Sequence, residues 1–402
     1  MSRDHFFGYR REDGRVGIRD FPVVVAAMDN ANPLARRIAA MVKGAVPIVA
    51  AYGRGQKGED LRVHDQTLIN YGAHPNASCV LVVSLEQITA RALAEPIGAT
   101  GKPVDWVDVQ SCGGTLKALE VGVRKLNALI AARKPTLREK CGLEELVIGL
   151  ECGGSDAVSG MTGNSTLGIV SDRIVAAGGT AILSEPEEII GAEHLLVERA
   201  ASPGIAKDLL DVVARWEAYA RYVGMDMAPL GGDNIKGGLS TTEEKSLGAV
   251  RKGGTSPLRQ VIGMGATPTE KGLVFLDAPG PGAENTTSLA AAGAQLILFS
   301  TGIGNPIGNP MAPTIKVTGS PGTARDFADN IDLSVAGIIE GSLTLPQAAD
   351  RLMDHMLAVT EGLQTASERL GDTEITISRV ENGFLKLWEE GYFDREDARA
   401  DH

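Results

Sequence analysis

The chain is poor in aromatic residues, in histidine and in basic charge. Phe, Trp and Tyr make up 4% of its 402 residues, and it has 6 histidines. Lysine and arginine number 39 against 51 acidic residues, which gives a formal net charge of −12. A nucleic-acid-binding protein needs a basic surface, so this balance excludes nucleic acid as the expected partner. A small anionic substrate remains compatible with it, because a few local cations can dominate a pocket.

Paired cysteines and long apolar runs are also lacking. Four cysteines without paired spacing give no disulfide framework. The longest apolar runs, such as Val23–Met28, are far shorter than the roughly 20 residues of a membrane-spanning helix. The first residues are polar and charged, unlike a secretory signal. We therefore expect a cytoplasmic protein that does not bind a membrane.

Glycine is abundant, with 49 residues, and short apolar runs alternate with helical patterns. Continuous apolar runs are typical of strands buried on both faces, and helices between them favour parallel sheets. The predicted helices are Pro33–Lys43, Leu116–Ala132 and Thr166–Ala177. The predicted strands are Val23–Met28, Val46–Ala51, Val80–Leu85, Val104–Val109, Leu146–Glu151, Thr180–Glu185, Gly272–Asp277, Gln295–Thr301 and Thr314–Thr318.

The charged stretch Arg133–Glu145, which contains Pro135, separates two such blocks. The sequence therefore predicts an α/β protein of two α/β blocks with mainly parallel sheets, plus a C-terminal helical tail from Leu345 to Gly391. We expect an N-terminal α/β domain over residues 1–135 and a C-terminal α/β domain over residues 136–402.

Polar and glycine-rich segments follow several predicted strands. In parallel α/β sheets, ligands bind outside the carboxyl ends of the strands. Leu146–Glu151 runs into Cys152-Gly153-Gly154-Ser155-Asp156, and Gln295–Thr301 runs into Gly302. Glu185 ends another strand, and Glu193 and His194 follow it. We expect these segments to converge on an active site.

The residue types suit proton removal next to a carboxylate. That step builds up negative charge, so an enzyme places cations or a metal on the carboxylate and a base near the proton. Glu185, Glu193 and His194 are candidate ligands of a divalent ion. Lys236, Lys245 and Lys316 are candidates for a base, an acid or a carboxylate clamp.

Each of these residues also has a structural interpretation. Glu193 and His194 are adjacent in a predicted helix and point about 100° apart, so at most one of them faces the site. The run Glu243-Glu244-Lys245 after two threonines is equally typical of a capped helix start. The prediction of an active site therefore depends on all of these polar segments together and on no single residue.

Longer segments then indicate one family. They are Gly8–Arg19, His74-Pro75-Asn76, Cys152–Asp156, Glu185–His194, Lys236–Gly254 and Ala312–Lys316. In this order they resemble the altronate dehydratase / galactarate dehydratase family over essentially the whole chain. The resemblance implies a lyase that eliminates water from a small sugar acid to give a 2-keto-3-deoxy acid. It further implies a divalent metal, Fe²⁺ or Mn²⁺, and an oligomer with a separate small subunit.

The residue chemistry and the resemblance together give the following predicted roles. The predicted catalytic residues are Lys236, Lys245 and Asp156, and the predicted metal ligands are Glu185, Glu193 and His194. The predicted substrate-binding residues are Arg54, His64, His74, Asn76, Gly153, Gly154, Ser155, Gly302 and Lys316.

The chain departs from the family pattern at three cysteine positions and at Ile303, where the family often has an arginine. The family usually has cysteines where this chain has Asn30, Gln56 and Gln87. Amides are poor substitutes for thiolates as iron ligands. The segment Tyr52–Leu61, with His64, resembles the sulfolactate sulfo-lyase branch of the same family, whose members release sulfite and leave pyruvate.

Sulfite leaves a carbon more readily than hydroxide does, so this branch has less need of a strong Lewis acid. Arg54 and His64 would then bind the sulfonate or the carboxylate, for which a guanidinium is well suited. Three functions stay open: a sugar-acid dehydratase, a sulfolactate sulfo-lyase, and a non-catalytic regulatory or binding subunit. The retained acidic residues and lysines argue against the third.

Overall fold

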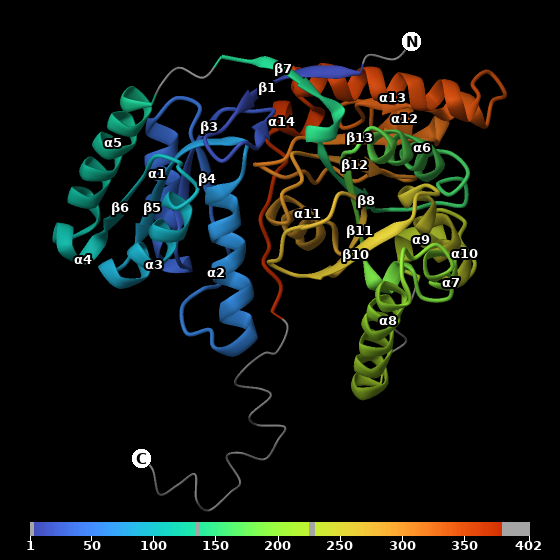
Figure 1. The fold of residues 1–402 in the computed structure, drawn as a ribbon, viewed down its shortest axis with the longest axis horizontal. Coiled ribbons are helices and arrows are strands. Elements are labelled where there is room, and N and C mark those ends of the chain that lie inside the picture. The colour runs from blue at the N-terminus through green and yellow to red at the C-terminus, as the bar shows by residue number, and fades with distance from the viewer. Residues whose placement is uncertain (1–3, 134–136, 225–229, 380–402) are drawn as a thin grey trace, which may run out of the picture.

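The computed structural model describes residues 4–133, 137–224 and 230–379, and it contains two parallel sheets side by side (Figure 1). The N-terminal sheet has four strands in the order β4-β3-β5-β6, all parallel. Its strands are continuous apolar runs, so both faces are covered. They are β3 (Phe21–Ala26), β4 (Val46–Ile48), β5 (Ala77–Ser84) and β6 (Val104–Asp108).

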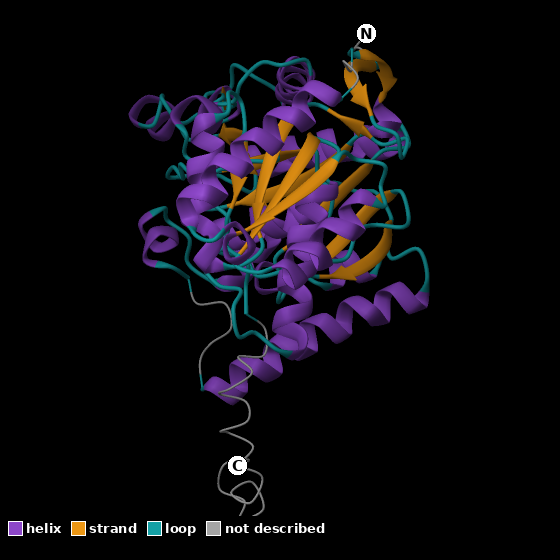
Figure 2. Cartoon of the chain, turned by 90° about the vertical axis from the view of Figure 1, so that its left-hand side faces the viewer, coloured by secondary structure: helices purple, strands orange, loops and turns teal. Residues whose placement is uncertain are grey.

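Helices cover both faces of this sheet (Figure 2). Alternate strand residues belong to different cores: Val24 packs with α1 and α5, and Val23 packs with α2 and α3. This alternation follows from the two-residue period of a strand. The helices of this block are α1 (Asn32–Met41), α2 (Gly58–Ala73), α3 (Gln87–Gly98), α4 (Val109–Cys112) and α5 (Thr115–Ala132).

The second sheet has seven parallel strands in the order β10-β11-β9-β8-β12-β13-β14. Helices α6 (Gly163–Ala176) and α13 (Leu345–Thr360) pack on one face, and α11 (Gly282–Ala291) packs on the other. The strands are β8 (Val147–Cys152), β9 (Thr180–Ser184), β10 (Leu258–Gly263), β11 (Gly272–Asp277), β12 (Leu296–Ser300), β13 (Thr314–Thr318) and β14 (Leu333–Ser334).

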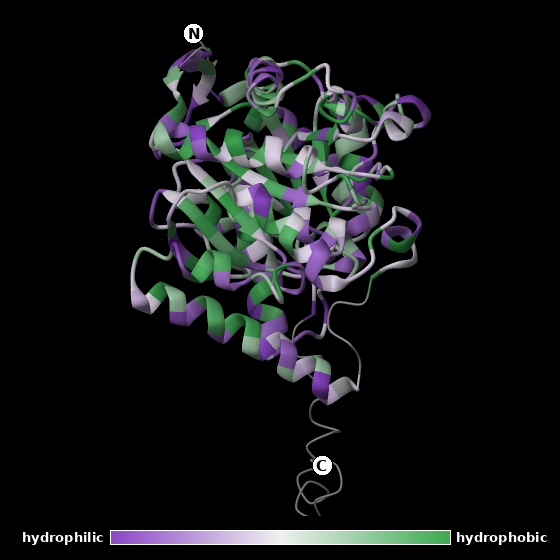
Figure 3. Cartoon of the chain, turned by 90° about the vertical axis from the view of Figure 1, so that its right-hand side faces the viewer, coloured by the Kyte–Doolittle hydropathy of each residue, from purple (hydrophilic) through white to green (hydrophobic). Residues whose placement is uncertain are grey.

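The long helix α8 (Pro203–Val223) projects from this block at the bottom of Figure 3, with hydrophobic and hydrophilic residues alternating along it. Its Leu209, Val212 and Val213 pack into the core, so only one face of the helix is held. The remaining helices are short. They are α7 (His194–Val197), α9 (Gly232–Lys236), α10 (Thr242–Ala249), α12 (Pro321–Asp326) and α14 (Ala366–Leu370). In the described part of the chain, no helix is both long and apolar enough to cross a membrane.

The predicted α/β class with mainly parallel sheets is confirmed. The predicted strands Gly272–Asp277 and Thr314–Thr318 occur with the predicted ends, and the other predicted strands and helices occur with shifted ends. Short strands were not predicted, among them β1 (His5–Arg10), β2 (Val16–Gly17) and β7 (Glu139–Gly142), which form an antiparallel sheet. The helical tail needs a correction: α13 and α14 are helical, but residues 371–379 are not. Residues 380–391 of that prediction lie outside the described residues.

The two sheets share one hydrophobic core. A single cluster joins residues of the four-stranded sheet to residues of β9, β11 and α11 in the second block. Within the first block, Gly17 permits a close approach of β2 to the segment before β5, because a Cβ on Gly17 would lie 2.1 Å from the carbonyl oxygen of Pro75. The division into domains at residue 135 stays a prediction.

Asn76 connects the two blocks by hydrogen bonds. It is fully buried, and its side-chain N–H groups donate to the carbonyls of Gln295 (2.9 Å) and Met311 (2.8 Å). Its Oδ1 accepts from the backbone N–H groups of Ile18 (2.8 Å) and Arg19 (3.3 Å). One side chain therefore satisfies four buried backbone groups from both blocks.

We expect Asn76→Ala to lower the free energy of unfolding by about 3 kcal/mol, because it leaves buried backbone groups without partners. Urea unfolding followed by circular dichroism measures this change. The control is Asn127→Ala, since Asn127 is exposed and bonds only within its own helix. Equal unfolding midpoints for the two variants would contradict this role of Asn76.

Candidate active site

Acidic residues stand at the carboxyl ends of two neighbouring strands of the large sheet. Glu151 and Cys152 end β8, and Glu185 directly follows β9. Glu185 has φ of 74°, the one positive φ of a non-glycine residue in the described part of the chain. A side chain in this conformation costs energy and persists only where its surroundings fix it, which is common at functional sites.

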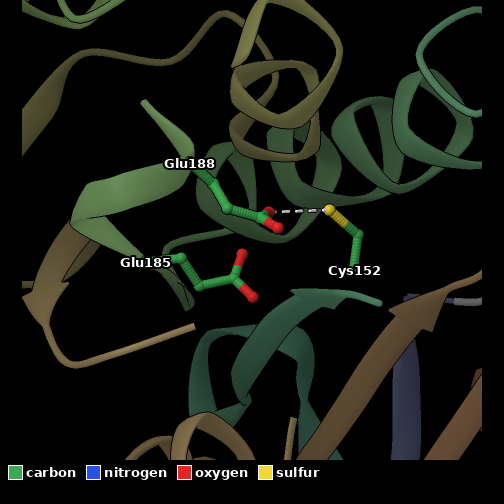
Figure 4. Close-up of side chains that lie close together, drawn as sticks. All are labelled: Cys152, Glu185 and Glu188. Atoms are coloured by element: carbon green, nitrogen blue, oxygen red, sulfur yellow. Dashed lines mark hydrogen bonds between the residues drawn. The ribbon is translucent and has the colours of Figure 1, made fainter. Parts of the chain in front are cut away.

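Cys152, Glu185 and Glu188 converge on one point (Figure 4). Glu188 lies in the 3₁₀ turn Pro186–Glu188, and its Oε2 accepts a hydrogen bond of 3.1 Å from the Cys152 thiol. One donor atom of each residue lies within 4.8 Å of the others, and all three side chains are buried. In the described ranges, this is the group of His, Cys, Asp and Glu that could hold a metal ion.

The ammonium of Lys252 already lies among these three donors. Its Nζ is 3.0 Å from Cys152 Sγ, forms an ion pair with Glu185 Oε2, and is 3.5 Å from Glu188 Oε2. Lys245, on α10, adds a second ammonium 3.1 Å from Glu188 Oε1. Both oxygens of Glu188 and one oxygen of Glu185 therefore face a lysine.

The buried titratable groups shift one another's pKa values. Burial raises the pKa of Glu185 well above its usual value and raises the pKa of Glu151 to about 8. Burial acts in the same direction on Glu188, but Lys252 and Lys245 outweigh it and lower its pKa to about 2. Burial also raises the pKa of Cys152 to about 11. Near neutral pH, Glu188 is therefore a carboxylate and Cys152 a thiol.

One buried carboxyl oxygen each of Glu151 and Glu185 accepts no hydrogen bond from a described donor. Glu151 accepts a hydrogen bond from the Asn285 side chain at one oxygen, and its Oε1 has no partner among the described residues. Glu185 Oε1 likewise accepts no hydrogen bond from a described donor, and the Glu185 carboxyl group lies within hydrogen-bond reach of the Glu151 carboxyl group. Buried polar atoms are rarely left without partners, so these oxygens indicate a place for a proton or a ligand group.

A cavity of about 500 Å³ adjoins the cluster. Asp156, Lys245 and Arg251 line it, and Lys245 also contacts Glu188 of the buried cluster. The cavity wall is fixed by backbone bonds, because Gly154 O accepts from the N–H groups of Gly302 and Ile303, both at 3.0 Å. A small polar anion would meet both cations and a carboxylate there.

Several predicted residues come together at this place. Asp156, Ser155 and Lys245 line the cavity, and Glu185 belongs to the adjoining cluster. Gly153, Gly154 and Gly302 shape the loops behind Asp156, and a Cβ on Gly302 would lie 2.3 Å from Asp156 Cγ.

The predicted ligand set of Glu185, Glu193 and His194 is not brought together. Among the residues that the structure describes, neither Glu193 nor His194 joins a metal-binding group with Glu185. Glu193 instead accepts a 2.6 Å hydrogen bond from the backbone N–H of Gly191, and His194 is exposed at the start of α7. Lys236 is also exposed, at the end of α9, and is not part of the cavity lining.

The predicted residues of the first block lie in other surroundings. Arg54 is exposed in the loop after β4. His64 is buried, with Nδ1 2.9 Å from Asp65 Oδ1 and Nε2 3.2 Å from Tyr52 O. His74 and Asn76 lie at the junction of the two blocks, where Asn76 N–H donates to His74 Nδ1 (3.1 Å). These contacts give His64, His74 and Asn76 structural roles.

Lys316 is buried apart from the cavity. Its ammonium bonds the carbonyl of Ile307 and lies 3.5 Å from the centre of the Phe299 ring. Burial lowers the pKa of Lys316 to about 7. Lys316 therefore lies in the core on β13, beside Phe299 of β12, and the charge of the nearby Glu151 carboxyl group acts against the effect of burial on its pKa.

Sequence reasoning missed Glu188, Lys252 and Glu151, and it did not treat Cys152 as a ligand. Two signals could have found them. Glu151 and Cys152 are polarisable groups at the end of an apolar strand, and Glu188 follows Glu185 by three residues. Lys252 gives no local signal, because it lies 100 residues from Cys152 and 67 from Glu185.

Comparison with known proteins places the chain in a class of enzymes. Residues 8–134 match the D-galactarate dehydratase/altronate hydrolase second domain, and residues 143–382 match the D-galactarate/altronate dehydratase C-terminal domain. The enzymes that carry these domains are lyases, and so is this chain. The chain belongs to the D-galactarate/altronate dehydratase family.

Individual relatives agree with this assignment. The (2R)-sulfolactate sulfo-lyase subunit beta of Chromohalobacter salexigens is 35% identical over 382 residues, which cover 93% of this chain and 97% of the relative. The altronate dehydratase of Escherichia coli is 33% identical over 92% of this chain and 76% of its own length. The Escherichia coli galactarate dehydratase (L-threo-forming) is 35% identical over 58% of this chain and 45% of its own length.

The buried Lys316 predicts a dependence of stability on pH. In the folded chain Lys316 is mainly neutral above about pH 7, whereas in the unfolded chain it stays protonated up to its ordinary pKa of 10.5. The unfolded state therefore binds more protons in this window, and stability rises with pH by at most about 1.4 kcal/mol per unit. Burial likewise lowers the pKa of Lys102 to about 7, so Lys316→Met should reduce this rise and leave the part that Lys102 contributes.

Urea unfolding at several pH values between these limits compares the wild type with Lys316→Met. Lys207→Met serves as the control, since Lys207 is exposed on α8. Parallel pH profiles for the wild type and Lys316→Met would show that Lys316 is charged in the folded protein.

Proposed function

We propose that this lyase eliminates a β-substituent from a small 2-hydroxy acid, in the first place water from a sugar acid to give a 2-keto-3-deoxy acid. The observation that carries the proposal is the cavity in which Asp156 and Lys245 meet beside the buried acidic cluster. Its volume of about 500 Å³ suits a small polar molecule. Family membership supports the reaction class.

The residues of the cavity fit the chemistry of elimination. The C2–H bond breaks and its proton passes to a carboxylate, for which Asp156 is placed in the cavity wall. The electron pair forms the C2–C3 double bond, the C3–O bond breaks, and hydroxide leaves as water after taking up a proton. The enol then becomes the 2-oxo acid. Lys245 supplies the positive charge that stabilises the anion formed on the substrate carboxylate.

The predicted divalent ion, Fe²⁺ or Mn²⁺, takes no part in these steps. The donor types of Cys152, Glu185 and Glu188 suit such an ion. However, the Lys252 ammonium lies against all three donors, so the residues present do not fit a metal bound to all of them. The identity of a metal stays a prediction.

Release of sulfite from sulfolactate is the second candidate function. The sulfolactate sulfo-lyase subunit beta matches this chain over 97% of its own length, whereas the altronate dehydratase of Escherichia coli is covered over 76%. In this reaction the C3–S bond breaks in place of C3–O, and sulfite carries away the electron pair. The name of that relative also supports our proposal that a separate small subunit joins this chain. The third possibility, a non-catalytic subunit, has no comparable support.

A turnover assay that measures 2-oxo acid and sulfite together identifies the substrate. The panel contains altronate, galactarate, related aldonates and both enantiomers of sulfolactate, with and without a candidate small subunit. We expect 2-oxo acid without sulfite from a sugar acid. Equal amounts of pyruvate and sulfite would instead establish the second candidate, and no product from any compound would contradict both.

Lys245→Ala should lower kcat by about 100-fold or more, because the charge that stabilises the anion is lost. KM should change less than kcat if the lysine acts mainly in the transition state. Steady-state kinetics on the best substrate measure both constants, and Lys207→Ala on the exposed face of α8 is the matched control. A kcat equal to that of the control would exclude Lys245 from the chemistry.

A further inference from the structure

The atoms of the Cys152/Glu185/Glu188 group are already engaged by cations of the chain itself. Glu188 uses Oε1 for Lys245, at 3.1 Å, and Oε2 for Lys252 and the Cys152 thiol. Glu185 uses Oε2 for Lys252, and Cys152 Sγ accepts from the same ammonium at 3.0 Å. Glu185 Oε1 is the one carboxyl oxygen of this group without a partner among the described residues.

A metal ion and this ammonium exclude each other. Nζ of Lys252 lies within hydrogen-bond reach of all three donors. An ion that coordinated all three would have to lie against the ammonium, and two cations in contact in a low-dielectric interior repel strongly. Lys252 is completely buried, so its ammonium cannot turn out into solvent without opening the packing around it.

The balance of charge leads to the same result. Within the Cys152/Glu185/Glu188 group, two lysines face two carboxyl groups, and the neighbouring Glu151 bonds to Asn285 rather than to a cation. A structural or catalytic divalent ion is held where buried carboxylates outnumber the cations beside them. Here the lysines supply that compensation.

We propose that Lys252 is a built-in cation that takes the place of a divalent metal in this chain, so that the Cys152/Glu185/Glu188 group binds no metal while Lys252 is present. The proposal deepens the proposed function and rests on it for its meaning in the reaction. Lys252 is then a positioning residue: it holds Glu185 and Glu188 in place, and Glu188 holds Lys245 at the cavity. The substrate carboxylate meets Lys245, the cation that lines the cavity.

Binding of Co²⁺ to the full-length protein tests this proposal without any substrate, so it can fail independently of the proposed function. Coordination by a thiolate gives Co²⁺ a near-ultraviolet charge-transfer absorption. The wild type should show none that depends on Cys152. Lys252→Ala, which frees three donors and opens space between them, should gain the absorption, with an affinity higher by about 100-fold or more.

Two further variants make the test specific. The double variant Lys252→Ala/Cys152→Ser should lose the new absorption, and Lys207→Ala should behave as the wild type. A Co²⁺ absorption in the wild type that Cys152→Ser removes would overturn the proposal. A folded Lys252→Ala variant without the absorption would overturn it as well. If Lys252→Ala does not fold, comparison of the wild type with Cys152→Ser still decides the question.

Discussion

The buried ammonium of Lys252 is the interaction on which the site depends. Removing two opposite charges from water costs several kcal/mol per ion, and only good geometry and further hydrogen bonds offset this cost. Lys252 has both, since Glu185, Glu188 and Cys152 all face it. The positive φ of Glu185 is consistent with this need for good geometry, because that backbone conformation places the Glu185 carboxyl group against the ammonium.

This cluster is placed by the order of the strands. β8 and β9 are neighbours in the large sheet, so Cys152 and Glu185 emerge side by side at the same edge. The turn after β9 places Glu188 beside these two residues. The 3₁₀ turn Val250–Gly253 packs against α6 and places Lys252 in the same cluster. Lys245 then connects the cluster to the cavity. The carboxyl ends of the parallel strands therefore carry the candidate site, as they carry ligand sites in other α/β proteins.

Five of the six segments that carry the family resemblance divide into two physical groups, and the sixth, Ala312–Lys316, lies in and before β13 apart from the cavity. Cys152–Asp156, Glu185–His194 and Lys236–Gly254 build the cluster and the cavity wall. Gly8–Arg19 and His74-Pro75-Asn76 instead join the two blocks, where Arg19 bonds Glu368 at 2.9 Å and Asn76 bonds backbone groups on both sides. The resemblance therefore selects residues that build the candidate site as well as residues that hold the two blocks together. The observed contacts distinguish the two kinds.

The sequence by itself determined the α/β class, nine of the eleven strands in the two parallel sheets and the loops at their carboxyl ends, whereas β10 and β14 were not predicted. These follow from local patterns, since continuous apolar runs and glycine clusters act within a few residues. The short strand β1 escaped prediction because its partner β7 lies more than a hundred residues away and its apolar run is interrupted. The tertiary structure decided which charged residues meet. Lys252 joins Cys152 across 100 residues, and Glu193 and His194 turn away from Glu185 although they follow it closely. Such pairings depend on strand order and helix packing, which no local pattern contains.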